Sequence, residues 1–248
     1  MNDAVTSHSI TRWLVFGWRT FCQTKTTSIL FSSILGIIAA IIYIALIKVN
    51  ADLVIYPFIA GFFIVAPLLI IGFQRVAHQI SQGQKVIIKD FSIFHSEHNS
   101  GIWFAVFILC FCYFIWLTDA LVIYGLYFGI EPLEITNKLF TDPKLRQSLI
   151  LYLIYSGLMG LVTAIIGFLL GVFSIPLMIH QNMDFVPAVH LSIKTVFKHK
   201  WLMTKWASVL VAIMTITLVI ALPLMVVVFP VLGYASYAVY RDILVLKA

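Results

Sequence analysis

The chain has 248 residues, of which 62% are hydrophobic and only 10% are charged, whereas soluble domains have about 45–50% apolar and about 25% charged residues. Lys and Arg total 16 against 10 for Asp and Glu, which gives a formal net charge of +6. This composition excludes a soluble enzyme, a disordered chain and a disulfide-rich secreted scaffold, and it places most of the chain in lipid.

Apolar runs of about 20 residues are long enough to cross a bilayer as helices. The last run, 205–240, has 36 residues and would measure about 54 Å as one helix, well beyond a hydrocarbon core of about 30 Å. Pro223 lies near its centre, where proline removes a helix hydrogen bond, so we predict two short spans joined by a tight turn. The six predicted spans are 27–47, 53–73, 102–130, 148–179, 205–221 and 223–240.

The distribution of Lys and Arg predicts the orientation of these spans. With six spans and a cytoplasmic N-terminus, twelve of these residues fall on the inner face and only Lys48, Lys138, Lys144 and Arg146 fall on the outer face. Positive charge concentrates on the cytoplasmic side of membrane proteins. The first run has no convincing signal-peptide cleavage site and should stay as an anchor. We therefore expect a single multi-pass domain, 1–248, in the bacterial inner (plasma) membrane with both termini in the cytoplasm.

A basic amphipathic stretch precedes each of three pairs of spans, at about 10–25, 84–95 and 187–201. The pattern predicts three tandem hairpins, each launched by a helix that lies in the inner interface with its apolar face toward the membrane and its basic face toward anionic head groups. The apolar stripe of the first stretch is Ile10, Trp13, Leu14, Gly17, Trp18 and Phe21, and that of the third is Val189, Ile193, Val196 and Phe197. The predicted head-group contacts are Arg12, Arg19, Lys194, Lys198 and Lys200. Contact of these cations with nucleic acid is the less favoured interpretation.

Small residues recur at steps of four residues, with one step of three, in the first and fourth spans. Because lipid gives helices no hydrophobic drive to associate, close approach at small residues supplies it. The predicted packing faces are Ser32, Gly36 and Ala40 in the first span, and Ser156, Gly160, Ala164, Gly167 and Gly171 in the fourth. Packing within the chain is the favoured interpretation, and docking of a second chain on one face is the alternative.

Few residues could carry chemistry. Asp119 is the one carboxylate embedded in an apolar run, and an ionisable residue within the membrane suggests a functional site. Its distance of about 25 Å from the start of the span also fits a structural role near the outer interface. His95 and His98 could share a helix face beside Glu97, which is too few ligands for a structural metal site. His180 and His190 could approach His78, as a bis-histidine haem or copper site would require, although solvated histidines are the favoured interpretation.

The sequence also resembles a bacterial family of predicted integral membrane proteins of unknown function, some of whose members carry the label of a cytochrome c oxidase subunit. The matching residues extend over nearly the whole chain and include Gly17-Trp18-Arg19, Ala66-Pro67-Leu68-Leu69 with Gly72 and Arg75, Ser174-Ile175-Pro176-Leu177, and Phe229 to Tyr234 with Tyr240-Arg241-Asp242. The general plan is similar to the membrane domain attached to some glycerophosphodiester phosphodiesterases. The resemblance implies a six-helix inner-membrane protein and no particular chemistry.

Motifs for nucleotide binding, Ser-His-Asp catalysis or zinc ligation are absent from the sequence. We therefore expect an all-α polytopic bundle that is not an enzyme and has no catalytic, cofactor-binding or metal residues, acting as a scaffold or as an accessory subunit of a membrane complex, or self-associating. One alternative is a transporter of a small solute, an ion or lipid with a path between the repeats and Asp119 near its outer mouth. Another is a subunit associated with a respiratory oxidase.

Overall fold

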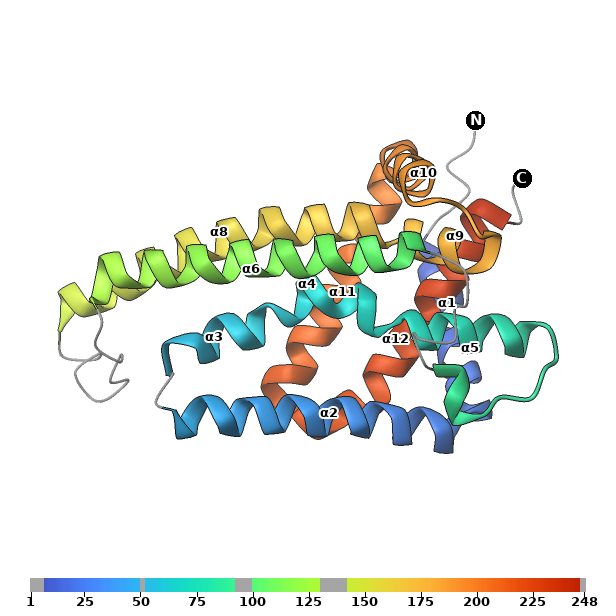
Figure 1. Ribbon diagram of the computed structural model, residues 1–248, viewed down its shortest axis with the longest axis horizontal. Coiled ribbons are helices and arrows are strands. Elements are labelled where there is room, and N and C mark those ends of the chain that lie inside the picture. Colours follow the sequence, from blue (N-terminus) through green and yellow to red (C-terminus); the bar gives the residue numbers. More distant parts are fainter. Residues whose placement is uncertain (1–6, 50–51, 92–99, 130–141, 246–248) are drawn as a thin grey trace. The chain divides into compact units, whose positions relative to one another are not determined.

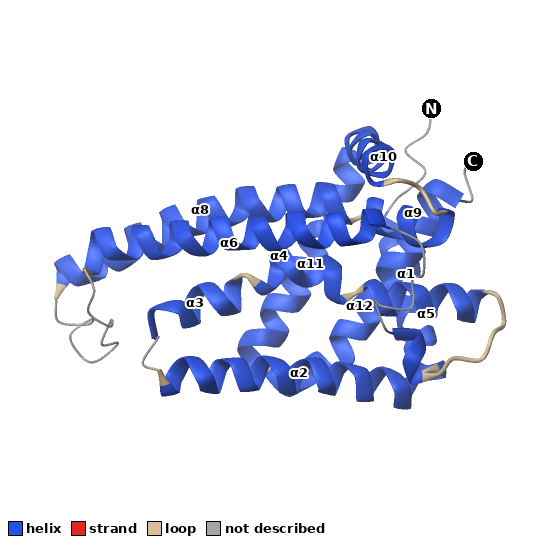
Figure 2. Cartoon of the chain, viewed as in Figure 1, coloured by secondary structure: helices blue, strands red, loops and turns tan. Residues whose placement is uncertain are grey.

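The computed structural model describes residues 7–49, 52–91, 100–129 and 142–245, and the regular elements within these ranges are all helical (Figure 2). Six stretches are long and apolar enough to cross a membrane: Lys25–Lys48, Pro57–Ser81, Gly101–Phe128, Pro143–Gln181, Lys200–Ile220 and Leu222–Val245. The predicted all-α polytopic bundle with six spans is confirmed. The largest boundary difference is in the second span, which extends to Ser81 rather than ending near residue 73.

Two of the six spans are built from more than one α-helix, and each break between α-helices lies close to a proline. The second consists of α3 (Asp52–Ala60), α4 (Phe62–Leu69) and α5 (Ile71–Ser81), with Pro57 in α3 and Pro67 in α4. The fourth consists of α8 (Pro143–Gly171) and α9 (Ser174–Gln181), which contains Pro176. A proline within a helix lacks the N–H for one backbone bond and clashes with the preceding turn, which accounts for the break that precedes Pro176. The first and third spans, α2 (Lys25–Lys48) and α6 (Ser100–Phe128), are single helices.

The split at Pro223 is confirmed. Helix α11 (Lys200–Ile220) ends before a single 3₁₀ turn, η3 (Leu222–Leu224), and α12 (Met225–Tyr240) returns beside it (Figure 1). The N–H of Leu224 donates to the Ala221 carbonyl at 2.8 Å and closes the turn. A single π-helical turn, η4 (Arg241–Val245), follows α12. The 36-residue apolar run is therefore a hairpin of two short helices, because one continuous helix would far exceed the bilayer thickness.

The chain divides into two compact units. The first comprises residues 1–38, 67–105 and 169–248, and the second comprises 39–66 and 106–168. The first unit has a core of aromatic rings in which Phe73 makes edge-to-face contacts with Phe91, Phe229 and Tyr234. The second has a smaller core of Ile64, Trp116 and Ala120, against which Tyr113 packs. Aromatic pairs in these geometries contribute about 0.5–1.5 kcal/mol beyond the burial of their area.

The first basic amphipathic stretch forms α1 (Ser7–Gln23), but its buried face differs from the predicted stripe. The residues that face inward are Ser9, Trp13, Gly17, Thr20 and Phe21, while Trp18 is half exposed. The reason is the packing of α1 along α12. A Cβ on Gly17 would overlap the Val231 carbonyl oxygen and lie 3.1 Å from the Cβ of Ala235. Close backbone approach at Gly17 therefore turns Trp18 outward.

The second predicted interfacial helix, 84–95, is not a helix in its first part. Residues 84–87 have no regular structure, and Ile88–Phe91 form one 3₁₀ turn, η1; residues 92–95 lie outside the described residues. Two local causes are visible. The β-branched run Val86, Ile87, Ile88 lowers helix propensity, and an Asp90 carboxylate oxygen accepts a hydrogen bond from the Ile87 N–H at 2.8 Å, which holds a turn instead of a helix.

The third basic amphipathic stretch forms α10 (Phe185–Lys198), and its buried face is also rotated from the predicted stripe. The buried residues are Ala188, Ser192, Thr195 and Val196, so Val196 alone belongs to both sets, while Phe197 is 63% exposed. The Ser192 hydroxyl donates to the Leu169 carbonyl at 2.7 Å. This carbonyl lies in the last turn of α8, where backbone acceptors lack partners within the helix. The hydrogen bond selects the face that α10 buries.

Candidate functional site

A cluster of polar and aromatic side chains lies where α5, α9 and α12 of the first unit come together. His78 is near the end of α5, His180 and Gln181 end α9, and Tyr237 and Tyr240 are in the last turn of α12. We call these five residues the His-Tyr cluster. The three helices lie at the ends of the second, fourth and sixth candidate spans, so chain topology alone brings their last turns to the same side of the membrane.

The two imidazole rings stack against each other. Their centroids are 4.4 Å apart and their planes are inclined by 33°. Tyr237 packs edge-on against both rings, with centroid distances of 5.9 Å to His78 and 5.5 Å to His180. Tyr240 lies 5.8 Å from His180 at 32°. The two histidines therefore sit in an aromatic environment instead of facing open water.

Hydrogen bonds connect most of the polar atoms of the cluster. His78 Nδ1 lies 2.9 Å from the Tyr237 hydroxyl, and its Nε2 lies 2.9 Å from Gln82 Nε2. The Gln181 amide donates to the Tyr240 hydroxyl at 3.0 Å. His180 Nε2 differs because it is buried and has no hydrogen-bond partner among the residues that the structure describes. The cluster thus holds α5, α9 and α12 together and leaves one imidazole nitrogen unused.

The geometry does not fit a haem held between the two histidines. Such a ligation needs two imidazole nitrogens that point at the iron from opposite sides, at about 2 Å each, as metal–imidazole distances require. Here the rings lie face to face at 4.4 Å, and both nitrogens of His78 have side-chain partners. Groups of three or more His, Cys, Asp or Glu suited to a metal ion are not found among the described residues.

The sequence predicted only part of this cluster. It allowed His180 to approach His78, and the structure brings the two together, but His190 is exposed on α10 and takes no part. Tyr237 and Tyr240 were missed, although both lie near the predicted inner end of a span, as His78 and His180 do. His95 and His98 lie outside the described residues.

Asp119 lies on α6 in the second unit, half-buried and next to the core residue Ala120. Within the described part of the chain, its carboxylate makes no hydrogen bond or ion pair. The neighbouring Thr118 hydroxyl donates to the Phe114 carbonyl at 2.9 Å. Asp119 is therefore an isolated carboxylate.

The predicted packing face of α8 lies against other parts of the chain. A Cβ on Gly160 would lie 2.7 Å from Trp116 Nε1, one on Gly167 would lie 3.5 Å from Leu109, and one on Gly171 would lie 2.8 Å from Pro67. The other two residues are the buried Ser156 and the half-buried Ala164. Of the three residues of the predicted α2 face, Ser32 is buried, whereas Gly36 and Ala40 are exposed. The two stripes therefore have different surroundings.

The predicted head-group cations are all on the surface. Arg12 is 69% exposed and forms an ion pair with Asp242 at 3.0 Å, while the Trp13 indole donates to the same carboxylate at 2.8 Å. The others, Arg19, Lys194, Lys198 and Lys200, are exposed. Arg12 thus links α1 to the turn after α12, and the remaining four have side chains open to a head group.

Comparison with known proteins places the chain in a family without an assigned chemistry. Residues 55–180, just over half of the chain, match a family model described as "Predicted integral membrane protein (DUF2189)". No curated protein and no solved structure matches the chain. The matched segment holds both histidines of the His-Tyr cluster and ends before its tyrosines. The chain therefore belongs to this family of integral membrane proteins.

Proposed function

We propose that the protein is a non-enzymatic accessory or scaffold subunit of a larger complex in the bacterial inner membrane, with both termini in the cytoplasm. The observation that supports this proposal is that polar side chains of the first unit bond to one another. Arg12 pairs with Asp242, His78 with Tyr237, and Gln181 with Tyr240. These groups bond to one another across helices, which gives them a role in holding the fold.

The second unit supplies a surface for a partner subunit. Phe107, Phe111 and Phe114 recur at helical spacing on α6 and are each more than half exposed, and the rings of Phe107 and Phe111 are nearly parallel at 6.2 Å. We call these three residues the α6 aromatic stripe. Aromatic residues are enriched in the buried centres of protein interfaces. The exposed side of α8 is mainly aliphatic, with Ile154, Leu161 and Ile165 among its residues.

This difference allows a matched experiment. The chain is expressed in its native membrane, extracted in mild detergent and analysed by native electrophoresis and quantitative mass spectrometry. We expect a stoichiometric partner with the wild-type chain, loss of that partner with F107A/F111A/F114A, and retention with the aliphatic control I154A/L161A/I165A. A chain that migrates alone, or a partner lost equally in both variants, contradicts the proposal.

A second candidate is transport of a small ion or solute, and Asp119 favours it. A half-buried carboxylate within an apolar helix and without an ion pair is costly, and such residues often mark ion pathways. Asp119→Asn keeps the shape and removes the charge. Flux of protons or monovalent cations into proteoliposomes should fall with this variant if the carboxylate lies on a path. Equal flux for wild-type and variant proteoliposomes and for protein-free vesicles would eliminate transport of these ions.

A further inference from the structure

We infer that α10 is a membrane-surface helix whose outward face binds the head groups of anionic lipids. Its place in the chain restricts where it can lie. The fourth span ends at Gln181 and the fifth begins at Lys200, so only Phe185–Lys198 and a few linking residues connect two membrane crossings. A helix tied this closely to two spans remains at the membrane surface.

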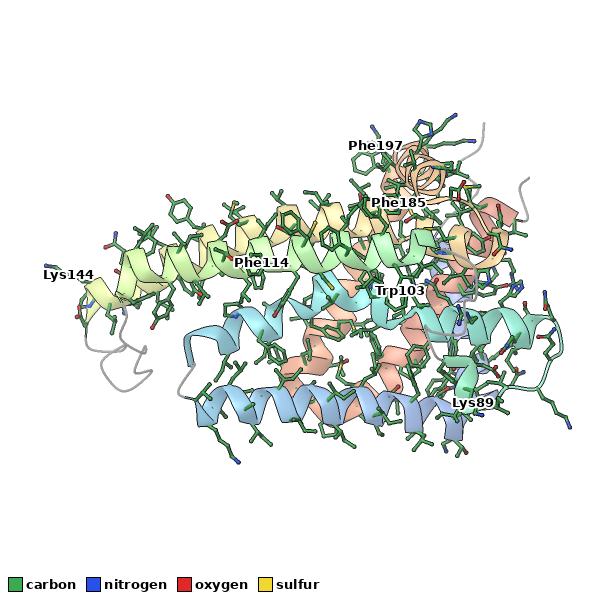
Figure 3. All side chains as sticks on the ribbon, viewed as in Figure 1. Lys89, Trp103, Phe114, Lys144, Phe185 and Phe197 are labelled. Carbon is green, nitrogen blue, oxygen red and sulfur yellow. The ribbon has the colours of Figure 1, made fainter. Side chains whose placement is uncertain are left out.

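The exposed face of α10 has an apolar side and a basic side. Val186 and Phe197 lie within about 20° of each other around the helix axis, given about 100° per residue, and they are 73% and 63% exposed. Lys194 and Lys198 are both exposed. Measured around the axis from Val186, they lie at about 80° and 120°. Figure 3 shows Phe197 pointing outward from α10. Apolar and basic strips side by side suit a helix in the plane of the membrane interface.

The start of α11 extends the same surface. Trp201 is 76% exposed, and the Lys200 ammonium lies 6.0 Å from the centroid of its ring. Tryptophan prefers the membrane interface, and a large exposed indole at the first turn of a span is placed to occupy it. Phe197 and Trp201 therefore set the depth of the helix in the interface, and the lysines meet the lipid phosphates.

Charge complementarity identifies the occupant as anionic lipid. Between Gln181 and Trp206 the chain has four lysines and two histidines, and Asp184 is its only acidic residue. Each lysine close to an anionic surface strengthens binding about fivefold. The opposite face of α10 is already occupied by its own contacts, including the hydrogen bond from Ser192 to Leu169, so the helix is fixed with its basic face outward.

The test uses the full-length protein in vesicles of phosphatidylcholine that contain about one third phosphatidylglycerol, which is anionic. Spin-labelled forms of both lipids report which one the protein immobilises. K194Q/K198Q/K200Q removes the three lysines, and K48Q/K144Q/R146Q removes three exposed cations predicted for the outer face. We expect the preference for phosphatidylglycerol to fall at least fivefold in the first variant and less than twofold in the second. Equal losses in both variants, or no loss in the first, overturn the inference.

Insertion depth gives a second readout. In a background that lacks Cys22, Cys110 and Cys112, the cysteine of Phe197→Cys is labelled with a fluorophore. Lipids that carry a nitroxide near their head groups quench this fluorophore when it lies at the same depth. We expect strong quenching at this position and weak quenching at Lys198→Cys. A Phe197→Cys label that only aqueous iodide quenches would overturn the inference. The inference rests on the membrane character of the chain and not on the proposed accessory role, so a failure here leaves the partner experiment unaffected.

Discussion

The hydroxyl oxygens of Ser28 and Tyr234 lie 2.6 Å apart in the interior of the first unit and connect the start of α2 to the middle of α12. Thr24 completes a three-hydroxyl ring, 2.9 Å from Ser28 and 3.0 Å from Tyr234. The Thr24 hydroxyl is also close to the Thr20 carbonyl at 2.9 Å. Each hydroxyl is thus satisfied in a buried site, and the ring joins the first and last spans.

Removing one member of this ring should destabilise the protein. Tyr234→Phe leaves Ser28 and Thr24 with each other but without the phenol, and a lost buried hydrogen bond costs about 1 kcal/mol. Ser28→Ala should cost a similar amount, and the double variant should cost less than the sum because the two residues share one interaction. Unfolding in mixed micelles measures all three. Thr26→Ala, at an exposed position, is the control and should change nothing; strict additivity would show that the ring is not a unit.

The contact between α1 and α12 should depend on Gly17. A methyl group there would overlap the Val231 carbonyl oxygen. Because this oxygen belongs to the backbone of α12 and cannot rotate away as a side chain can, the two helices must separate. We expect Gly17→Ala to destabilise the first unit by about 1–3 kcal/mol. Gly36→Ala is the matched control, since nothing lies within 4 Å of a Cβ at that position, and alanine should strengthen α2 by about 0.5–1 kcal/mol. Thermal unfolding of both variants decides, and equal behaviour would refute the close approach.

The packing face of α8 can be tested in the same way within the second unit. Gly160→Ala brings a methyl group to 2.7 Å from Trp116 Nε1, whose indole also donates to the Ser156 carbonyl at 3.3 Å. We expect a shift in the Trp116 fluorescence and a loss of about 1–2 kcal/mol of stability. Gly157 is about one helical turn away, and because nothing lies within 4 Å of a Cβ added there, it should accept alanine without either effect. An unchanged spectrum in Gly160→Ala would mean that Trp116 does not lie on this glycine.

The two histidines of the His-Tyr cluster should respond differently to substitution. His180→Leu removes a buried nitrogen that has no partner within the described ranges and should be neutral or slightly stabilising. His78→Leu leaves the Tyr237 hydroxyl with the 3.3 Å contact to Ser81 as its one remaining partner in the described part of the chain and should cost about 1–2 kcal/mol. Unfolding curves at one fixed pH compare the two. A strong loss of stability in His180→Leu would show that the His180 nitrogen has a bonding partner in the membrane. The prediction that His180 only packs against the neighbouring rings would then be wrong.

Hydropathy and proline positions predicted the spans because both act locally. The 36-residue run is too long to cross the bilayer as one helix, which predicted the turn at Pro223, and that prediction is confirmed. The faces of α1 and α10 were not predictable in the same way. Each face is selected by one small residue that meets a distant segment: Gly17 against Val231, and Ser192 against Leu169. An apolar stripe in sequence does not distinguish lipid from protein as its neighbour, since both are apolar.

The His-Tyr cluster shows a related limit. That three spans end on one side of the membrane follows from their number, so an approach of His78 and His180 could be anticipated. The ring stacking and the hydrogen bond between His78 and Tyr237 depend on the rotation of α5, α9 and α12 about their axes. The rotation of a helix in a membrane is set by tertiary packing, which cannot be read from the amino-acid sequence alone.

We predict that the chain crosses the membrane six times, in three hairpins that begin and end on the cytoplasmic side. Labelling with a membrane-impermeant maleimide tests it directly, in the background without native cysteines and with intact cells. Leu222→Cys, at the exposed turn between α11 and α12, should react from outside, and a cysteine appended after Ala248 should react only after the membrane is permeabilised. A C-terminal cysteine that reacts in intact cells, with Leu222→Cys protected, would contradict the account.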